Sequence, residues 1–319
     1  MSVERPPYRD IPRRWTINIG ELGEFGLIAR LTQDLTQGPE VEVGPGDDAA
    51  VVRAPDGRVV ATSDLLVEGR HFRRDWSGPY DIGRKAAAQN LADVVAMGAR
   101  PTALLVGFGA PAETPVDWAM DLMRGLREEC ALVGASVVGG DIVRAPVITL
   151  AVTALGDLAG RRPLLRSGAA PGDLVAVRGR LGWAGAGLEL LLAGLGGPPE
   201  LIDAHRRPQP PYEAGAEAVR LGATALLDIS DGLVQDLGHI ASASRVRIEL
   251  DSSTLPVPMP GPDGVRLALT GGDDHAFAGT FPARTVLPAS WRIVGRVVAG
   301  AGLTVDGDLY GPGGWDHFG

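Results

Sequence analysis

The stretch GPGDDAA, residues 44–50, places two adjacent carboxylates, Asp47 and Asp48, between a glycine turn and a short apolar run. Asp and Gly are common turn residues, so this stretch alone predicts only a tight loop that leads into a strand. Similar carboxylates, most of them with Gly, Ser or Thr alongside, recur in TSD at 62–64, NLAD at 90–93, GGD at 139–141, DISD at 228–231 and GGDD at 271–274. Oxygen-rich loops that converge on one cleft bind hard cations such as magnesium, and through them phosphates. The recurrence therefore predicts one acidic, cation-binding cleft.

The composition is that of an acidic globular protein. A length of 319 residues suggests two domains, and an apolar fraction of 45% is ordinary. The net charge of −9 argues against a nucleic-acid or anionic-membrane partner, and it requires that a polyphosphate ligand bring cations with it. Cys130 is the only cysteine, which fits a reducing compartment, and no apolar run approaches the length of a membrane span. We therefore expect a cytoplasmic protein.

Hydrophobic patterning predicts an α+β fold. Helices are expected at 21–35, 81–97, 116–133, 184–193, 212–221 and 233–243. Strands are expected at 49–52, 59–62, 102–108, 136–138, 147–155, 174–177, 225–229, 246–250, 265–269, 276–280 and 291–298. The turn at 55–58 is typical of a hairpin that joins the first two strands.

The domain organisation is read from changes in composition. Residues 157–172 are polar and rich in Arg, Gly and Pro, which is typical of a connection between domains. We therefore predict a flexible tail at 1–19, an N-terminal domain at 20–156, a linker at 157–172 and a C-terminal domain at 173–319.

Asp93 is the carboxylate with the most unusual surroundings. It lies inside the apolar run 91–97 and shares one helix face with Asn90 and Met97. A carboxylate there is costly to bury unless it is paired or bound to a metal. A solvent-facing Asp is the alternative, but the apolar neighbours favour a functional role. The helix expected at 233–243 also has free N–H groups at its start, which would suit a phosphate.

Several common site motifs are missing or incomplete. Lys85 is the only lysine and does not belong to a P-loop, so phosphate chemistry must use metal ions, arginines and backbone N–H groups. The histidines do not have H-E-x-x-H spacing, and the sequence contains no pair of cysteines. Both observations argue against structural zinc. The stretch GFGAPA at 107–112 is similar to a dinucleotide-binding loop, but the acids at the expected offset fall in the same helix. An oxidoreductase interpretation depends on that stretch alone.

Taken in order, the motifs resemble one family. They are GDDAAVV at 46–52, TSDLLVEGRHF at 62–72, NLADVVAMGARP at 90–101, VGGD at 138–141, LLRSGAAPGD at 164–173, LDISDGLVQDLGHIA at 227–241, LTGGDDHAF at 269–277 and WDHFG at 315–319. This series resembles the thiamine-monophosphate kinases, a family of the aminoimidazole ribonucleotide synthetase superfamily, over roughly residues 20–319. The VEGRHF block and the DHFG ending are the parts more specific to the kinases.

The resemblance implies a fold and a set of site residues. The fold would be two α/β domains of the aminoimidazole ribonucleotide synthetase-like type, with the N-terminal domain dimerising through its sheet and ATP and several Mg²⁺ ions in the cleft. Metal-binding positions would be Asp48, Thr62, Ser63, Asp64, Asp93, Asp141, Asp228 and Asp231. ATP-contacting positions would be Gly140, Asp141, Arg166 and Ser230. Substrate-contacting positions would be His71, Asp273 and Trp315.

The implied reaction is ATP-dependent phosphorylation of thiamine monophosphate to thiamine diphosphate. The acceptor phosphate is already an anion, so no residue is expected to act as a general base, and the metal ions offset the repulsion between the phosphates. Asp273 stands where the family usually has Glu, and His275 stands where an aromatic residue is frequent. Plain surface roles for His71 and Trp315, and a turn role for Asp273, are the alternatives. Another ATP-dependent member of the superfamily and a catalytically idle nucleotide-binding protein are the competing functions.

Overall fold

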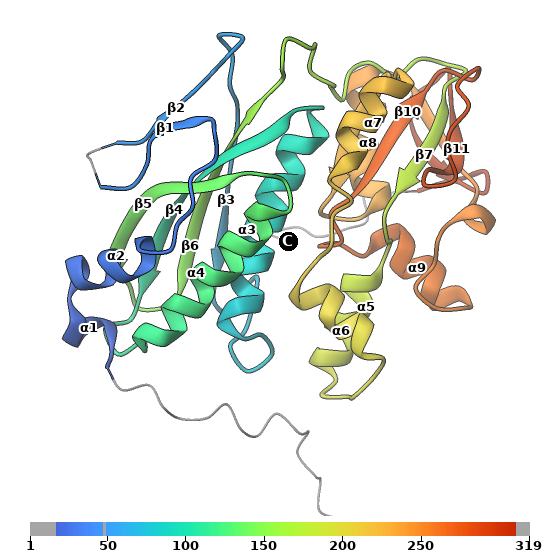
Figure 1. Ribbon diagram of the computed structural model, residues 1–319. Helices are drawn as coiled ribbons and strands as arrows, with labels where there is room; N and C mark the ends of the chain where they lie inside the picture. Colours follow the sequence, from blue (N-terminus) through green and yellow to red (C-terminus); the bar gives the residue numbers. More distant parts are fainter. Residues whose placement is uncertain (1–16, 47–48, 311–319) are drawn as a thin grey trace, which may run out of the picture.

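The computed structural model describes residues 17–46 and 49–310 (Figure 1). The expected tail before residue 17 and the site candidates Asp47, Asp48 and Trp315 lie outside the described residues. The described chain forms two large sheets that stand side by side, together with a small ribbon made of β1 (Val41–Val43) and β2 (Val51–Val52). The mixed α/β architecture expected from the sequence is confirmed, whereas the domain boundaries stay a prediction.

The first sheet has four strands in the order β3-β6-β4-β5. These are β3 (Val60–Val67), β6 (Thr149–Asp157), β4 (Arg100–Ala110) and β5 (Ser136–Arg144). Strands β4 and β5 are parallel, so the chain must cross over between them, and it does so through α4 (Val116–Ala131). Helix α4 and helix α3 (Pro79–Ala96) cover one face, while α1 (Ile19–Leu22) and α2 (Glu24–Thr32) lie at the end of that layer (Figure 1).

The opposite face of this sheet carries exposed apolar side chains. Leu65 on β3, Leu105 on β4 and Val143 on β5 are 57%, 37% and 54% exposed. Side chains alternate between the two faces of a strand, and these belong to the set that points away from α3 and α4. A sheet with both faces rich in apolar residues usually has both faces covered in the functional assembly.

The second sheet has seven strands in the order β13-β12-β9-β11-β7-β10-β8. They are β13 (Asp308–Leu309), β12 (Gly302–Val305), β9 (Arg247–Leu250), β11 (Arg292–Val298), β7 (Leu174–Arg178), β10 (Ala276–Phe281) and β8 (Ala225–Ile229). One face packs against α8 (Leu233–Ser244), and the other packs against α7 (Glu213–Leu221). Helices α5 (Trp183–Leu192), α6 (Pro199–Arg206) and α9 (Pro262–Thr270) share a smaller apolar cluster (Figure 1).

Helix α3 lies between the half of the molecule built on the four-stranded sheet, the first half, and the half built on the seven-stranded sheet, the second half. It is buried on most of its surface. Leu91 and Val94 belong to the core of the four-stranded sheet, whereas Ala92 and Val95 pack with Phe277 of the seven-stranded sheet. A helix that is apolar on most sides is stable only in such a sandwiched position. Polar groups on α3 are therefore placed at the junction of the halves.

Glycines allow the backbones around α3 to approach closely. A Cβ atom at Gly83 of α3 would stand 2.1 Å from the carbonyl oxygen of Leu122 on α4. On the other side, a Cβ atom at Gly215 of α7 would stand 2.2 Å from the carbonyl oxygen of Val95. Both distances are too short for any side chain, so α3 is held at the shortest possible distance from a helix of each half.

Four local expectations were wrong. The helix expected at 21–35 is divided at Gly23, whose φ of 77° interrupts it. The segment expected to be a strand at 265–269 is part of α9, because a short apolar run fits either structure and Pro262 favours a helix start. The hairpin around residue 57 does not form, since β3 pairs with β6 over its whole length. Strand β5 runs on through Asp141, so the GGD motif lies within a strand.

Candidate functional site

Acidic side chains meet where α3 passes between the sheets. Thr62 and Asp64 are two residues apart on β3, so both point toward α3. The Thr62 hydroxyl donates to Asp93 Oδ2 at 2.7 Å. Asp64 Oδ2 accepts a hydrogen bond from Gln89 Nε2 at 3.0 Å, and its backbone N–H donates to Asn90 Oδ1 at 3.1 Å. One face of α3 thus fixes the strand that carries the TSD motif.

Asp93 is crowded by like charges. Burial raises its pKa to about 7, and the charges of Asp228 and Asp64 add to the increase. The hydrogen bond from Thr62 lowers the pKa but does not outweigh these effects. The raised pKa of Asp93 thus results first from burial and second from the neighbouring carboxylates. The sequence-based inference that Asp93 is not an ordinary surface residue agrees with this environment.

Asp228 enters the cluster from the second half, at the end of β8. It is buried, and its Oδ2 lies 3.1 Å from His275 Nδ1. Burial lowers the pKa of His275, but the hydrogen bond and charge of Asp228 outweigh burial, and the pKa lies above its ordinary value. His275 Nε2 has no hydrogen-bond partner among the described residues. The histidine at this position therefore orients the Asp228 carboxylate.

The DISD loop is held by the carboxylate of Asp236, which follows the motif on α8. Asp236 Oδ2 accepts hydrogen bonds from the backbone N–H groups of Ser230, Asp231 and Gly232, each at 3.1 Å. Burial raises the pKa of Asp236 to about 7, with Asp228 as the next cause. These three N–H groups belong to the loop before α8, so the expectation that the first N–H groups of the helix itself face a phosphate stays a prediction.

Asp273 lies beside this loop and is paired with Lys85. Its backbone N–H donates to Ser230 O at 2.8 Å, and its Oδ2 lies 2.8 Å from Lys85 Nζ on α3. Burial raises the pKa of Asp273, but the positive charge of Lys85 outweighs burial and holds the pKa well below its ordinary value. This carboxylate is thus ionised and matched by a cation, unlike Asp93.

The Asp93 cluster does not include Ser63, Gly140 or Asp141, although all three are expected site residues. Ser63 points to the other face of β3, where Thr153 Oγ1 donates to its hydroxyl at 3.0 Å. Gly140 and Asp141 lie on β5, at the opposite edge of the sheet from β3, and Asp141 is exposed. Adjacent strands are roughly 4.8 Å apart, so about 14 Å of sheet separates β3 from β5. Within this chain, the set of proposed residues is divided between two faces of the sheet.

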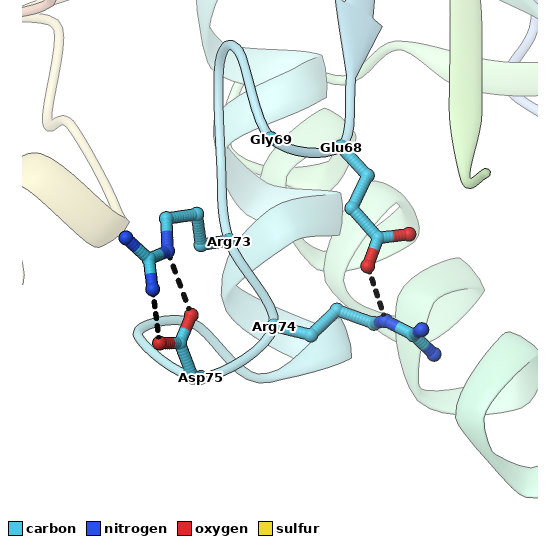
Figure 2. A pocket seen from close by; sticks show the side chains of 5 residues that line it. All are labelled: Glu68, Gly69, Arg73, Arg74 and Asp75. Atoms are coloured by element: carbon cyan, nitrogen blue, oxygen red, sulfur yellow. Dashed lines mark hydrogen bonds and ion pairs between the residues drawn. The ribbon is translucent and has the colours of Figure 1, made fainter.

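His71 follows β3 in a turn. Its Nδ1 accepts a hydrogen bond from the Val67 N–H at 3.0 Å, so the remaining ring proton is on Nε2 in the neutral form. Beside it is an open hollow of about 510 Å³ lined by Glu68, Gly69, Arg73, Arg74 and Asp75. Figure 2 shows that the charges in this hollow are paired, Arg73 with Asp75 and Arg74 with Glu68. The hollow is therefore polar without a large net charge.

Arg166 lies in the connection between the halves and is exposed. Its backbone carbonyl accepts a hydrogen bond from Ser244 Oγ at 2.7 Å, which ties this part of the connection to α8. Its neighbours Leu165 and Ser167 line a second hollow of about 550 Å³, together with Arg161, Arg162 and other residues. The Arg166 guanidinium is thus available at the surface, away from the Asp93 cluster.

The acidic cluster contains the types of ligand that magnesium prefers, but its side chains alone do not form a complete coordination shell. Carboxylate and hydroxyl oxygens are the ligands that Mg²⁺ prefers, and the neighbouring charges of Asp228 and Asp64 contribute to the raised pKa of Asp93. However, no group of three or more His, Cys, Asp or Glu side chains within residues 17–46 and 49–310 is arranged to hold a metal ion alone. The donor types therefore fit the ion, and phosphate oxygens would complete the coordination.

Two features of the site were not recognised in the sequence. Lys85 was noted only as the sole lysine, and its burial beside a carboxylate of the other half has no local signature. Asp236 follows the DISD motif by five residues, inside the helix expected at 233–243, and was assigned no role from the sequence. Its position four residues after Gly232, the residue before the first turn of α8, was the available signal for a capping role.

Comparison with known proteins places this geometry in context. Residues 46–158 match the family model "AIR synthase related protein, N-terminal domain". The chain is 49% identical to the thiamine-monophosphate kinase of Mycobacterium tuberculosis strain H37Rv over 310 residues, which cover 94% of this chain and 92% of that protein. Among the described residues, no helix has the length and apolar character that a membrane crossing requires.

Solved structures of similar proteins have the same fold. The thiamine-monophosphate kinase of Stenotrophomonas maltophilia K279a superposes with a TM-score of 0.78 at 32% identity, covering 89% of this chain and 95% of that one. A structure of AaThiL complexed with AMPPCP and TMP superposes with a TM-score of 0.76 at 36% identity, covering 95% of this chain and 99% of that one. The match extends across both sheets and α3 between them.

Proposed function

The chain belongs to the thiamine-monophosphate kinase family and is an enzyme of that family; we propose that it transfers the γ-phosphoryl group of ATP to thiamine monophosphate, with magnesium assistance. The observation that carries the proposal is the 49% identity to a thiamine-monophosphate kinase over 94% of this chain. The complex of AaThiL with AMPPCP and TMP supports the choice of the two substrates.

The cluster around Asp93 is the proposed place of the reacting phosphates. Among the described residues, those that would hold magnesium are Thr62, Ser63, Asp64, Asp93, Asp141, Asp228 and Asp231, and Asp48 belongs to the same proposal. When bound, magnesium supplies positive charge that offsets the repulsion between donor and acceptor phosphates. The residues themselves supply fixed oxygens, since Gln89, Asn90 and His275 hold the carboxylates of β3 and β8 in place.

No residue of the chain is assigned the role of general base. The acceptor phosphate is already an anion near neutral pH, so the transfer does not need a proton to be removed first. What the protein contributes is position and local charge. Gly140, Arg166 and Ser230 are the further residues proposed to contact ATP, and His71, Asp273 and Trp315 those proposed to contact the thiamine substrate.

The homodimer and the cytoplasmic location belong to the same proposal. The exposed face with Leu65, Leu105 and Val143 supports a partner copy on the four-stranded sheet. That face also carries Ser63 and, on β5, Asp141. A second copy there would explain why the proposed site residues occupy both faces of the sheet.

The test is incubation of the purified protein with ATP, magnesium chloride and thiamine monophosphate, followed by separation of the thiamine phosphates. We expect thiamine diphosphate and ADP in equal amounts, and no product from unphosphorylated thiamine. Equal turnover of an aminoimidazole precursor, or ADP formation without thiamine diphosphate, would contradict the proposal.

A further inference from the structure

Lys85 is an unusual residue in this chain. It is the only lysine, it lies on α3 at the junction of the halves, and it is 2% exposed. Its Nζ contacts Asp273 Oδ2 at 2.8 Å and the backbone carbonyl of His205 at 3.4 Å. An ammonium group so deeply buried is costly to desolvate, and an ion pair of this kind is weak evidence for stability alone. Its presence points instead to a need for defined geometry.

Asp273 is held in place from several directions. Its φ of 64° is rare for a residue other than glycine, and its N–H is bound to the carbonyl of Ser230. Gly272 before it packs against that carbonyl so closely that a Cβ atom would stand 2.5 Å from it. The side chain is 42% exposed, and Oδ1 has no hydrogen-bond partner among the described residues. One oxygen is thus anchored on Lys85, while the other remains available beside the DISD loop.

His205 does not compete with Lys85 as the cation that pairs with Asp273. Burial and the nearby Lys85 charge lower the pKa of His205 to about 3, so the ring is neutral at physiological pH. The ring meets Trp76 edge-on, with the centroids 6.4 Å apart. The Lys85 ammonium thus contacts a neutral carbonyl and the Asp273 carboxylate, and Asp273 is the one that matches its charge.

We infer that Lys85 is a positioning residue for the substrate: its ammonium group fixes the Asp273 carboxylate in the orientation that binds the cationic, aminopyrimidine-bearing part of thiamine monophosphate. This inference depends on the proposed function. A carboxylate that stays ionised and keeps one free oxygen complements both the thiazolium charge and an amino donor. Lys85 belongs to the first half and Asp273 to the second, so the orientation exists only when the halves are docked.

The experiment compares Lys85→Met with the unaltered enzyme. Methionine keeps most of the buried volume, and the Asp273 carboxylate that loses its partner is exposed enough to be hydrated. We expect KM for thiamine monophosphate to rise at least about tenfold, with KM for ATP unchanged and kcat within a few-fold. The Kd of thiamine monophosphate, measured by calorimetry without ATP, should rise by a similar factor.

A matched control is Arg207→Met. Arg207 Nε pairs with Asp81 Oδ1 at 3.2 Å and also joins the second half to α3, but at the start of the helix. If Lys85 only held the halves together, both variants would have the same effect on KM. A second comparison is the double variant Lys85→Met/Asp273→Asn, which leaves no buried charge unpaired and so protects against loss of folding. We expect its KM to match that of Lys85→Met, because a misplaced Asp273 contributes nothing further.

The outcomes separate this inference from the proposed function. If the unaltered protein makes thiamine diphosphate but Lys85→Met has the same KM and Kd for thiamine monophosphate, the positioning role is wrong and the kinase proposal stands. A further large rise in KM in the double variant would show that Asp273 acts without Lys85, which also overturns the inference. If the unaltered protein neither binds nor phosphorylates thiamine monophosphate, both statements are wrong.

Discussion

Helix α3 carries two charged side chains that lie in opposite electrostatic environments. Asp93 is surrounded by Asp64 and Asp228, and its pKa is raised to about 7. Lys85, eight residues earlier on the same helix, is paired with Asp273, whose pKa is held below its ordinary value. The region around Asp93 holds more carboxylates than cations, whereas the region around Lys85 is balanced. The proposed cation site is therefore distinguished by carboxylates that lack a matching cation rather than by the number of carboxylates.

The largest effect is expected from Asp93→Asn. The substitution removes a proposed magnesium ligand while the amide oxygen can still accept the Thr62 hydrogen bond, so folding should be kept. We expect turnover to fall on the order of 10²–10³-fold, as when a fixed group that stabilises transition-state charge is lost. Initial rates of thiamine diphosphate formation over a magnesium titration are the measurement. Asp117→Asn on the exposed first turn of α4 is the control, and equal rates in the two variants would contradict the role of Asp93.

The second effect is a pH dependence of stability without divalent cations. Asp93, Asp236 and Asp274 have pKa values raised to about 7, with burial as the largest cause in each case. Between pH 4 and pH 7 the folded state therefore holds protons that the unfolded state has released, so stability falls as pH rises. One such carboxyl changes the free energy of unfolding by about 3 kcal/mol between pH 5 and pH 8. Urea unfolding at each pH measures it, and Asp93→Asn should flatten the curve.

A third effect is stabilisation by the cation itself. At pH 8 and a concentration of one hundred times Kd, magnesium chloride should raise the free energy of unfolding by about 2.7 kcal/mol. The gain should be smaller at pH 6, because protons compete for Asp93. Thermal unfolding with and without magnesium, in the absence of ATP, measures both. A gain that is the same at the two pH values, or that survives Asp93→Asn, would place the ion elsewhere.

The smallest effect is expected around the Lys85–Asp273 ion pair, where the two charges are balanced. Asp273→Glu adds one methylene but keeps the charge facing Lys85, so the ion pair can re-form with a small shift of the carboxylate. We expect KM for thiamine monophosphate to change by no more than about threefold, because the negative charge and its pairing with Lys85 are both kept. Steady-state kinetics with varied thiamine monophosphate test this. A tenfold change would mean that the length of this side chain decides substrate fit.

The sequence was informative where a residue conflicted with its local surroundings. A single carboxylate in an apolar helix has few explanations, so Asp93 was identified correctly as unusual. The Lys85–Asp273 pair joins residues 188 positions apart, and no local pattern predicts such a contact. The strand expected at 265–269 failed because apolar runs of that length fit a strand and a buried helix equally well. The opposite direction of Ser63 from Thr62 and Asp64 was not predicted, because the strand was expected to end at residue 62, whereas β3 continues to Val67.

The contact between Gly215 and Val95 has a mechanical consequence. Because a Cβ atom at position 215 would stand 2.2 Å from the Val95 carbonyl oxygen, even alanine there would act as a wedge between α7 and α3. The approach of α7 to α3, the helix that carries Asp93, therefore depends on the absence of a side chain at position 215. A position outside the acidic cluster thus limits how closely the second half can approach the proposed site.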